Sequence, residues 1–277
     1  MIQRIFKSLC RGKDMNKEGG EKKRGQVTIF IIVGIVIVAL GVLVFTFFPE
    51  ISSTLGLGAS NPQEFMQGCM QNSIRDAVEK LSLQGGSVEP EHYFLYENSK
   101  VDYLCYTREY YVTCAVQRPL LEEYVEEQIK EAVKDKADEC LVDLKSSYER
   151  KGYSVEVLDG DFNIEIFPER VLADFNNSII LEKSDAEKYD FMRVSLNSNL
   201  YGFLVIADSV MRMEAEFGDS ETTFYMDYYR DLKMEKKKQS DGTTIYILTK
   251  RTSREKFQFA SRSLAWPPGY GSSSMLY

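Results

Sequence analysis

The chain has 277 residues, of which 44% are hydrophobic, 12% aromatic and 27% charged, and this composition excludes an intrinsically disordered protein. Its charge is unevenly distributed: residues 1–25 carry a net charge of +5, residues 26–48 carry none, and the remainder carries −13. This three-part division is not that of a simple cytosolic enzyme, and the acidic remainder argues against nucleic acid as a partner.

The first predicted element is a transmembrane helix at residues 26–48, behind a basic leader at residues 1–25. From Val27 to Phe48 the chain holds 22 uncharged residues, which would rise about 33 Å as a helix and cross the roughly 30 Å hydrocarbon core of a bilayer. The positive charge lies before this run, so the positive-inside rule keeps the N-terminus in the cytoplasm and places the rest outside. The lipid bilayer is therefore a predicted partner, and the predicted location is the cell membrane, crossed once.

The junction between the leader and the apolar run carries a short motif. Residues 23–30 read Lys-Arg-Gly-Gln-Val-Thr-Ile-Phe, with a basic residue and Gly25 in front of Gln26. This segment resembles the processing site of archaeal type IV pilin-like (class III) signal peptides. The resemblance implies cleavage between Gly25 and Gln26, which leaves the hydrophobic helix on the mature chain.

Three further segments are Gln84-Gly85-Gly86, Glu139-Cys140-Leu141, and Phe257 to Ala260 followed by Trp266-Pro267-Pro268-Gly269. Together they resemble a group of uncharacterised single-span surface proteins from small-genome archaea. The resemblance implies a surface location and a layout of helices. It implies no activity, since none is established for that group.

Four of the five cysteines follow the apolar run, an even number in a compartment where disulfides persist. Cys105 and Cys114 flank residues 106–113 as cross-strand partners of a hairpin would, while Cys69 and Cys140 each lie on an apolar helical face. We therefore favour the pairs 69–140 and 105–114, although free buried thiols remain an alternative. A zinc site is not expected, because the chain has no C-x-x-C pair and a single histidine, His92.

Three helices are predicted after a Gly/Ser-rich linker at residues 49–60. Asn61-Pro62 reads as an N-cap followed by proline, and helical spacing then continues over residues 62–82. The longest helix follows Pro119 and ends before Gly152, and a third helix covers about residues 199–216.

Strands are predicted between these helices and after the last one. Aromatic residues suggest short strands around the Cys105–Cys114 hairpin, from Tyr93 to Val112. Residues 153–158 and 162–167 alternate around Asp159-Gly160 and predict a hairpin, which residues 178–182 and 191–196 would extend into a sheet. Residues 243–249 and 256–263 are expected to close the domain.

Two residue patterns partly match known metal-binding or catalytic motifs. Asp159, Asp161 and Asn163 match the first ligand spacings of an EF-hand loop, but the glycine and the last carboxylate of that loop are missing. Ser253 and Lys256 fit S-x-x-K without the companion motifs of penicillin-binding enzymes. Neither pattern predicts a metal or catalytic site, and His92 is expected to be a surface residue.

Acidic and aromatic residues form two looser sets. The acidic set would be a pair of carboxylates for glycoside hydrolysis only if two of its members lined one cleft: Glu214, Glu216, Asp219, Asp227 and Asp231. The aromatic set would offer a platform for a glycan or protein partner, with half or more of its rings expected in the core: Tyr93, Phe94, Tyr96, Tyr103, Tyr106, Tyr110 and Tyr111. Asn176 opens the one N-glycosylation sequon, Asn-Asn-Ser.

The sequence as a whole predicts an α+β protein, with an N-terminal transmembrane helix followed by an extracytoplasmic domain of about three helices and antiparallel strands. The domain is expected at residues 61–265, with an irregular tail at residues 266–277. The leading hypothesis is a single-pass membrane-anchored surface protein with a structural or binding role, no cofactor and no catalytic residues. A pilin-like subunit processed after Gly25 and a membrane-tethered hydrolase are the alternatives, and self-association is left open.

Overall fold

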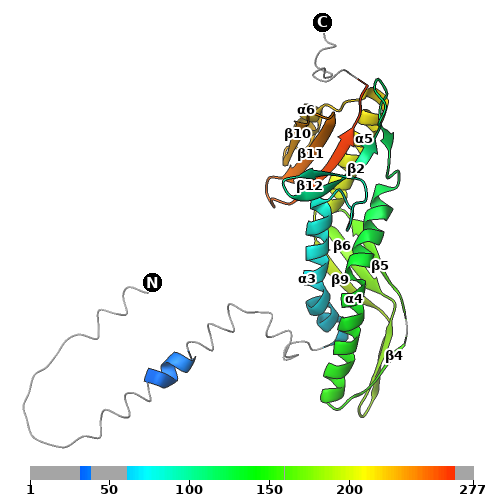
Figure 1. Cartoon of the computed structure of the whole chain (residues 1–277). Coiled ribbons are helices and arrows are strands. Elements are labelled where there is room, and N and C mark those ends of the chain that lie inside the picture. Colours follow the sequence, from blue (N-terminus) through cyan, green and yellow to red (C-terminus); the bar gives the residue numbers. More distant parts are fainter. Residues whose placement is uncertain (1–31, 39–60, 159, 266–277) are drawn as a thin grey trace, which may run out of the picture. The chain divides into compact units, whose positions relative to one another are not determined.

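The structure is a computed structural model that describes residues 32–38, 61–158 and 160–265. The chain divides into two units at residue 54, and the two are described separately. In the first unit, the described residues 32–38 are helical. All labelled helices and strands belong to the second unit (Figure 1).

The expected fold class is wrong in three respects. Within the described part of the chain, no helix is long and apolar enough to cross a membrane. Of the expected span 26–48, the structure describes residues 32–38. Residues 61–265 hold four helices instead of about three, and one strand pair is parallel. The additional helix, α6 (Thr222–Tyr228), is too short to show an apolar period in the sequence.

Other predictions fall outside the described residues. They include the processing site at Gly25 and Gln26, the linker at residues 49–60 and the tail at residues 266–277. The structure therefore bears on none of them.

Two long helices, α3 (Pro62–Leu83) and α4 (Leu121–Arg150), pack side by side (Figure 1). The expected start of α3 is confirmed, because the side chain of Asn61 accepts a hydrogen bond from the backbone N–H of Glu64 at 2.9 Å. Each helix buries one apolar stripe against the other and against the sheets. The fully buried residues of the two stripes include Met66, Met70, Ile74 and Leu81 of α3 and Val125, Ile129, Val133 and Leu144 of α4.

The structure contains two disulfides, and their partners are the pairs that the sequence favoured. Cys69 of α3 is bonded to Cys140 of α4, with 6.0 Å between the Cα atoms. Cys105 and Cys114 are bonded with their Cα atoms 5.4 Å apart. The first bond joins the two long helices, and the second closes a short loop beside the C-terminal sheet.

A three-stranded antiparallel meander lies along the helix pair (Figure 1). Each of its strands is broken once: β4 (Ser154–Leu158) continues as β5 (Phe162–Phe167), β6 (Arg170–Phe175) as β7 (Ser178–Glu182), and β8 (Ala186–Tyr189) as β9 (Met192–Asn197). The pairing order is β5-β6-β9 on one side of the breaks and β4-β7-β8 on the other. Burial alternates along β5 and β9, so one face of the meander packs on the helices.

The hairpin expected at Asp159-Gly160 is wrong. β4 pairs with β7 and β5 pairs with β6, so these two residues lie in the break of one long strand. A Cβ atom at Gly160 would lie 2.5 Å from the carbonyl oxygen of Asn176, which explains the glycine. An Asp-Gly pair suits both a tight turn and a close approach of two backbones, and the sequence does not distinguish them.

Helix α3 also covers the free edge of the meander. The side chain of Gln67 donates to the carbonyl oxygen of Ser195 at 3.0 Å and accepts from its N–H at 2.9 Å. One turn earlier, Gln63 bonds the backbone of Arg193 in the same way. These bonds satisfy strand β9, which has a partner strand only on its other side.

The remaining strands form a mixed sheet in the order β1-β2-β12-β11-β10, with β3 paired to β2. Its strands are β1 (Tyr93–Tyr96), β2 (Ser99–Tyr106), β3 (Ala115–Val116), β10 (Leu232–Lys238), β11 (Thr243–Lys250) and β12 (Lys256–Arg262). β2 and β12 are parallel, with α4, the meander and α5 (Leu200–Phe217) between them in the chain. The strand suggested at Tyr111 and Val112 forms instead at Ala115, after the second cysteine of the loop.

One continuous hydrophobic core joins the helix pair, the meander, α5 and the inner face of the mixed sheet. A second, small cluster lies on the other face of that sheet and contains Val101, Tyr103, Ile245, Ile247 and Ala260. The Gln84-Gly85-Gly86 segment has a packing reason: a Cβ atom on Gly86 would lie 2.6 Å from Cγ2 of Val125 in α4.

The two disulfides should differ in their effect on stability. The Cys69–Cys140 bond closes a separation of 71 residues, and the Cys105–Cys114 bond one of 9. In the chain-entropy model, replacing Cys69 and Cys140 by serine lowers the free energy of unfolding by about 4 kcal/mol, against about 2.5 kcal/mol for the other pair. Urea unfolding of the two double variants measures this, and equal losses would contradict it.

Candidate functional site

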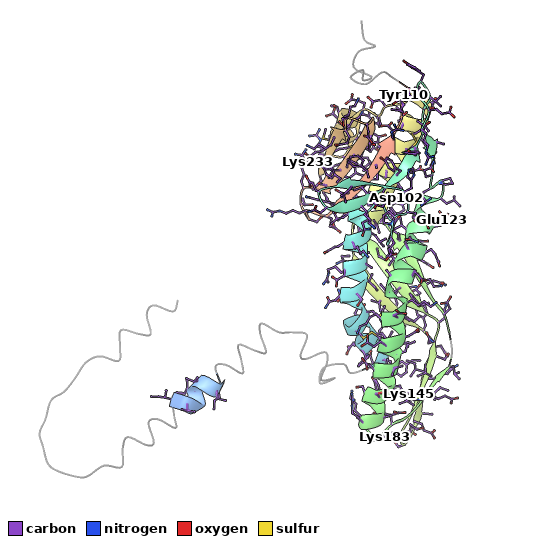
Figure 2. The ribbon with its side chains drawn as sticks, in the orientation of Figure 1. Asp102, Tyr110, Glu123, Lys145, Lys183 and Lys233 are labelled. Carbon is purple, nitrogen blue, oxygen red and sulfur yellow. A yellow bond between two sulfur atoms is a disulfide. The ribbon has the colours of Figure 1, made fainter. Side chains whose placement is uncertain are left out.

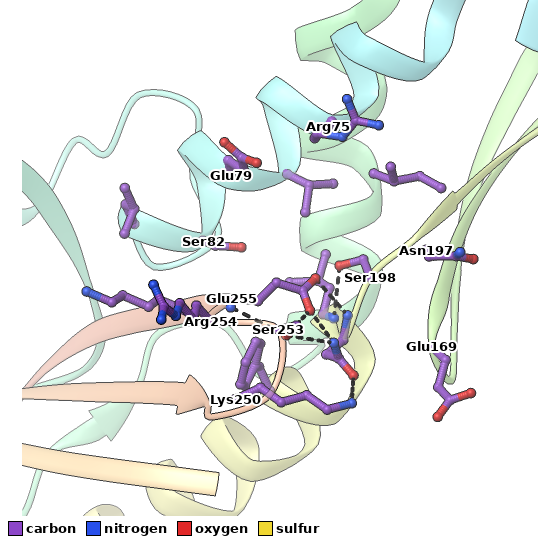
Figure 3. A pocket seen from close by; sticks show the side chains of 17 residues that line it. Arg75, Glu79, Ser82, Glu169, Asn197, Ser198, Lys250, Ser253, Arg254 and Glu255 are labelled. Atoms are coloured by element: carbon purple, nitrogen blue, oxygen red, sulfur yellow. Dashed lines mark hydrogen bonds between the residues drawn. The ribbon is translucent and has the colours of Figure 1, made fainter. Parts of the chain in front are cut away.

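Two adjoining cavities lie where the ends of four elements meet. The larger has a volume of about 810 Å³ and the smaller about 550 Å³. Both are bordered by Glu169, Asn199, Phe203 and Lys250, and together they are called the junction cleft here. Its walls come from the C-terminal half of α3, the end of β9, the start of α5 and the turn between β11 and β12 (Figure 3).

A hydrogen-bond network centred on Asn199 forms the floor of the cleft. The backbone N–H of Asn199 donates to Oε1 of Glu255 at 3.1 Å, and its side-chain amide donates to Oε2. The carbonyl oxygen of the same amide accepts a hydrogen bond from Nζ of Lys250. Ser253 donates its hydroxyl to Oε2 of Glu255 at 2.7 Å. The network holds the β11–β12 turn against the start of α5 (Figure 3).

Glu255 is ionised in this network. Partial burial raises the pKa of its carboxyl, but the hydrogen bonds from Ser253 and Asn199 outweigh burial and hold the pKa below its usual range. The carboxylate is thus already bonded by protein donors.

The N-terminus of α5 faces the cleft without a side-chain cap. Asn199 stands at the N-cap position, but its side chain is bonded to Lys250 and Glu255 instead of to the helix. The N–H of Leu200 is bonded to the hydroxyl of Ser198 at 3.2 Å. Among the described residues, the N–H groups of Tyr201 and Gly202 have no acceptor, and the first turn holds no acidic residue. The positive end of the helix dipole is therefore not compensated there.

Four basic side chains line the larger cavity: Arg75 on α3, Lys250 at the end of β11, Arg254 in the β11–β12 turn and Lys256 at the start of β12. Within the described part of the chain, none of them has a carboxylate in ion-pair contact. Glu79 and Glu169 also border the cavity. Together with Glu255, the lining of the larger cavity has four basic and three acidic side chains, in a region of the chain whose net charge is −13.

The S-x-x-K pattern lies in this cleft, but its arrangement is not that of a nucleophile and its base. The hydroxyl of Ser253 donates to Glu255, and Lys256 is an exposed strand residue. A serine hydroxyl that donates to a carboxylate is oriented by that bond, and no described histidine or lysine is bonded to it. The role of the pattern here is structural.

The acidic residues considered for hydrolysis do not meet at a cleft. Glu214 is only 2% exposed and accepts a hydrogen bond from the hydroxyl of Tyr246, and burial raises the pKa of its carboxyl. Asp219 is buried and paired with Lys236. The other three separate as well: Glu216 and Asp227 are exposed, and Asp231 borders the smaller cavity while accepting from the hydroxyl of Thr252 at 2.6 Å.

The aromatic platform is divided. Tyr103 and Tyr106 pack with the ring of His92, whose centroid lies 4.8 Å and 4.1 Å from theirs, and Phe94 and Tyr96 cover the small outer cluster. Tyr93, Tyr110 and Tyr111 are exposed, the last two within the Cys105–Cys114 loop (Figure 2 labels Tyr110).

Two further predicted positions lie near the break of the meander. The carboxylate of Asp161 accepts a hydrogen bond from Nζ of Lys130 at 2.8 Å, and this bond lowers the pKa of the carboxyl. Asp159 lies outside the described residues. No group of three metal-ligating side chains is found in the parts of the chain described by the structure. Asn176, the sequon residue, is exposed between β6 and β7.

Comparisons with known proteins give no match: no family model, no curated protein and no solved structure is similar to this chain. Sequence reasoning reached Ser253 and Lys256 through a chance motif and missed Arg75, Ser82, Asn199 and Lys250. Of these four, only Asn199 had a recognisable local pattern, because a polar residue in front of helically spaced apolar residues is typical of a helix N-cap.

The floor network should make stability depend on Glu255 at neutral pH. The folded-state pKa of Glu255 is lowered, so its contribution is present above the unfolded-state value of about 4.3 and is lost as the pH falls through the folded-state value. We expect Glu255→Gln to lower the free energy of unfolding by about 1 kcal/mol at pH 7, a modest value because the side chain is partly exposed. Urea unfolding at pH 7 and pH 3 should show the difference shrinking at the lower pH. A difference that is the same at both would contradict the assignment.

Proposed function

We propose that this protein is an extracytoplasmic binding protein, kept at the cell membrane by its N-terminal segment, that holds a small ligand in the junction cleft. The observation that carries the binding role is the cleft itself. Its larger cavity, about 810 Å³, is in the range of ligand pockets, and four separate elements contribute to its walls. Its lining combines apolar side chains such as Leu200 and Phe203 with polar groups that converge on the start of α5.

The location outside the cytoplasm is supported by two features. Both disulfides join cysteines of residues 61–265, and such bonds persist in oxidising compartments. The second feature is the order of the charges, because basic residues precede the uncharged run and acidic residues follow it. The pilin-like alternative depends on cleavage after Gly25, outside the described residues, and stays a prediction.

Binding is favoured over hydrolysis because of what the cleft contains. Glu255, a half-buried carboxylate, accepts bonds from Asn199 and Ser253, which leaves it no free role as an acid or base. The paired carboxylates that hydrolysis would need are separated, with Glu214 in the core. An arrangement of fixed donors around an open space is suited to holding a ligand.

The location predicts covalent features that mass spectrometry of protein from native membranes can detect. We expect the peptides with Cys69 and Cys140 to be linked before reduction, and Asn176 to carry a glycan because its side chain is exposed. The same digest shows whether the mature chain begins at Gln26. Free thiols at all four cysteines would contradict an extracytoplasmic location.

A blocked cleft tests the binding role. Gly202 borders the smaller cavity, and an added Cβ atom there meets nothing within 4 Å, so Gly202→Trp places a large side chain at the cleft from an open position. Gly68→Trp is the matched control, because Gly68 is an exposed glycine of α3 with equally open surroundings and does not line the cleft.

Calorimetric titration of the full chain in detergent with citrate, N-acetylglucosamine, putrescine and alanine samples four chemical classes. We expect at least one probe to bind saturably and to bind about tenfold more weakly to Gly202→Trp, with Gly68→Trp unchanged. Binding that neither variant changes, or no binding by any probe, would refute a ligand site in this cleft.

A further inference from the structure

One wall of the junction cleft carries a hydroxyl group that has no partner among the described residues. Ser82, near the end of α3, is only 6% exposed, and among the described residues its hydroxyl makes no hydrogen bond. Figure 3 shows this hydroxyl pointing from α3 toward the space above Glu255. Buried polar groups are generally hydrogen-bonded, and a hydroxyl that faces a cavity without a protein partner is able to bond a ligand there.

The start of α5 supplies further unused donors on the adjoining side. The N–H groups of Tyr201 and Gly202 point out of the first turn without acceptors in the described part of the chain. Gly202 has no side chain to cover them, and the space around its Cα is open. Backbone N–H groups at the start of a helix, together with the helix dipole, favour a negatively charged oxygen.

The charged side chains point to the same chemistry. Arg75, Arg254 and Lys256 bring positive charge to the larger cavity and are bonded to no described carboxylate, and Nη1 of Arg75 donates to the side-chain oxygen of Asn72 at 2.8 Å. The carboxylate of Glu255 already accepts hydrogen bonds from Asn199 and Ser253, so it offers few free lone pairs, but it keeps its negative charge. Free donors therefore outnumber free acceptors in the cleft, although Glu79 and Glu169 at its border set a limit on the charge of a ligand.

We infer that the junction cleft binds the oxyanion of a small molecule, a carboxylate or a phosphate, between α3, the start of α5 and the β11–β12 turn. Ser82 and the N–H groups of α5 are its hydrogen-bond donors, and Arg75 and Arg254 supply its counter-charge. This inference rests on the proposed binding function and specifies the ligand class of the same cleft.

The experiment is a calorimetric titration of the full chain in detergent with inorganic phosphate and, separately, with citrate. Arg75→Gln and Arg254→Gln should each weaken binding about 5- to 20-fold. Arg212→Gln is the matched control, because Arg212 is exposed and paired with Asp208 on α5, outside the cleft lining. Binding should also weaken when the salt concentration is raised from 50 to 500 mM, as expected for contacts between exposed charges.

Two variants separate the roles of individual groups. Ser82→Ala removes only the unpaired hydroxyl and should weaken binding about 3- to 10-fold with little change in stability, since no bond within the protein is lost. Glu79→Gln removes a negative charge at the border and should strengthen binding about 2- to 5-fold. Glu149→Gln, on an exposed part of α4, is its control and should have no effect.

The outcomes distinguish this inference from the function on which it rests. Citrate binding without phosphate binding assigns a carboxylate, the reverse assigns a phosphate, and either supports the inference if the arginine variants weaken it. A third outcome is that a neutral sugar or an amine binds, that Gly202→Trp blocks this binding, and that the arginine variants leave its affinity unchanged. In that case the proposed ligand class is wrong, while the cleft remains a binding site. If no probe binds, or if binding responds neither to Gly202→Trp nor to the arginine variants, both proposals fail.

Discussion

The interaction on which the rest of the structure depends is the contact between α3 and the free edge of the meander. Gln63 and Gln67 are four residues apart on the helix, a rise of about 6 Å, and they bond Arg193 and Ser195, two residues apart on β9, a span of about 6.6 Å. The near equality of these spacings lets two successive side chains satisfy one strand edge. Because α3 also packs on α4 and β12, its position fixes both sheets relative to the helix pair.

The junction cleft follows from this arrangement. Helix α3 extends from the meander to the mixed sheet, so the end of β9, the start of α5 and the β11–β12 turn meet beside its last turns. Ends of elements carry backbone groups that regular structure leaves unpaired, and here Asn199 satisfies some of them through Glu255 and Lys250. The groups that remain unpaired face the cavity. The hydrogen-bonding groups of the cleft therefore come from the ends of helices and strands, and no recognisable sequence motif marks them.

The sequence predicted what depends on neighbours in the chain. Helical spacing gave α3, α4 and α5, and the positions of the cysteines gave both disulfides. It did not predict that β4 pairs with β7, because the pair Asp159-Gly160 is typical of a hairpin turn. In the structure this pair lies in the break between β4 and β5, where the backbone of Asn176 comes close to Gly160. Arg75 and Ser82 look like ordinary residues of an amphipathic helix. Their relation to Arg254 depends on contacts across more than 170 positions, which no local pattern encodes.

The distribution of charge within the domain explains how an acidic protein can present a basic cleft. Several carboxylates are used inside it: Glu214 bonds Tyr246 in the core, Asp219 pairs with Lys236, and Glu255 holds Asn199. The net charge of −13 acts on an approaching anion from the whole surface, but at physiological ionic strength such repulsion is screened beyond about 8 Å. Inside the cleft, donors at contact distance and partial exclusion of water make the local field dominant. Selectivity for an anion would therefore arise from short-range contacts, and the surrounding acidic surface would mainly slow its entry.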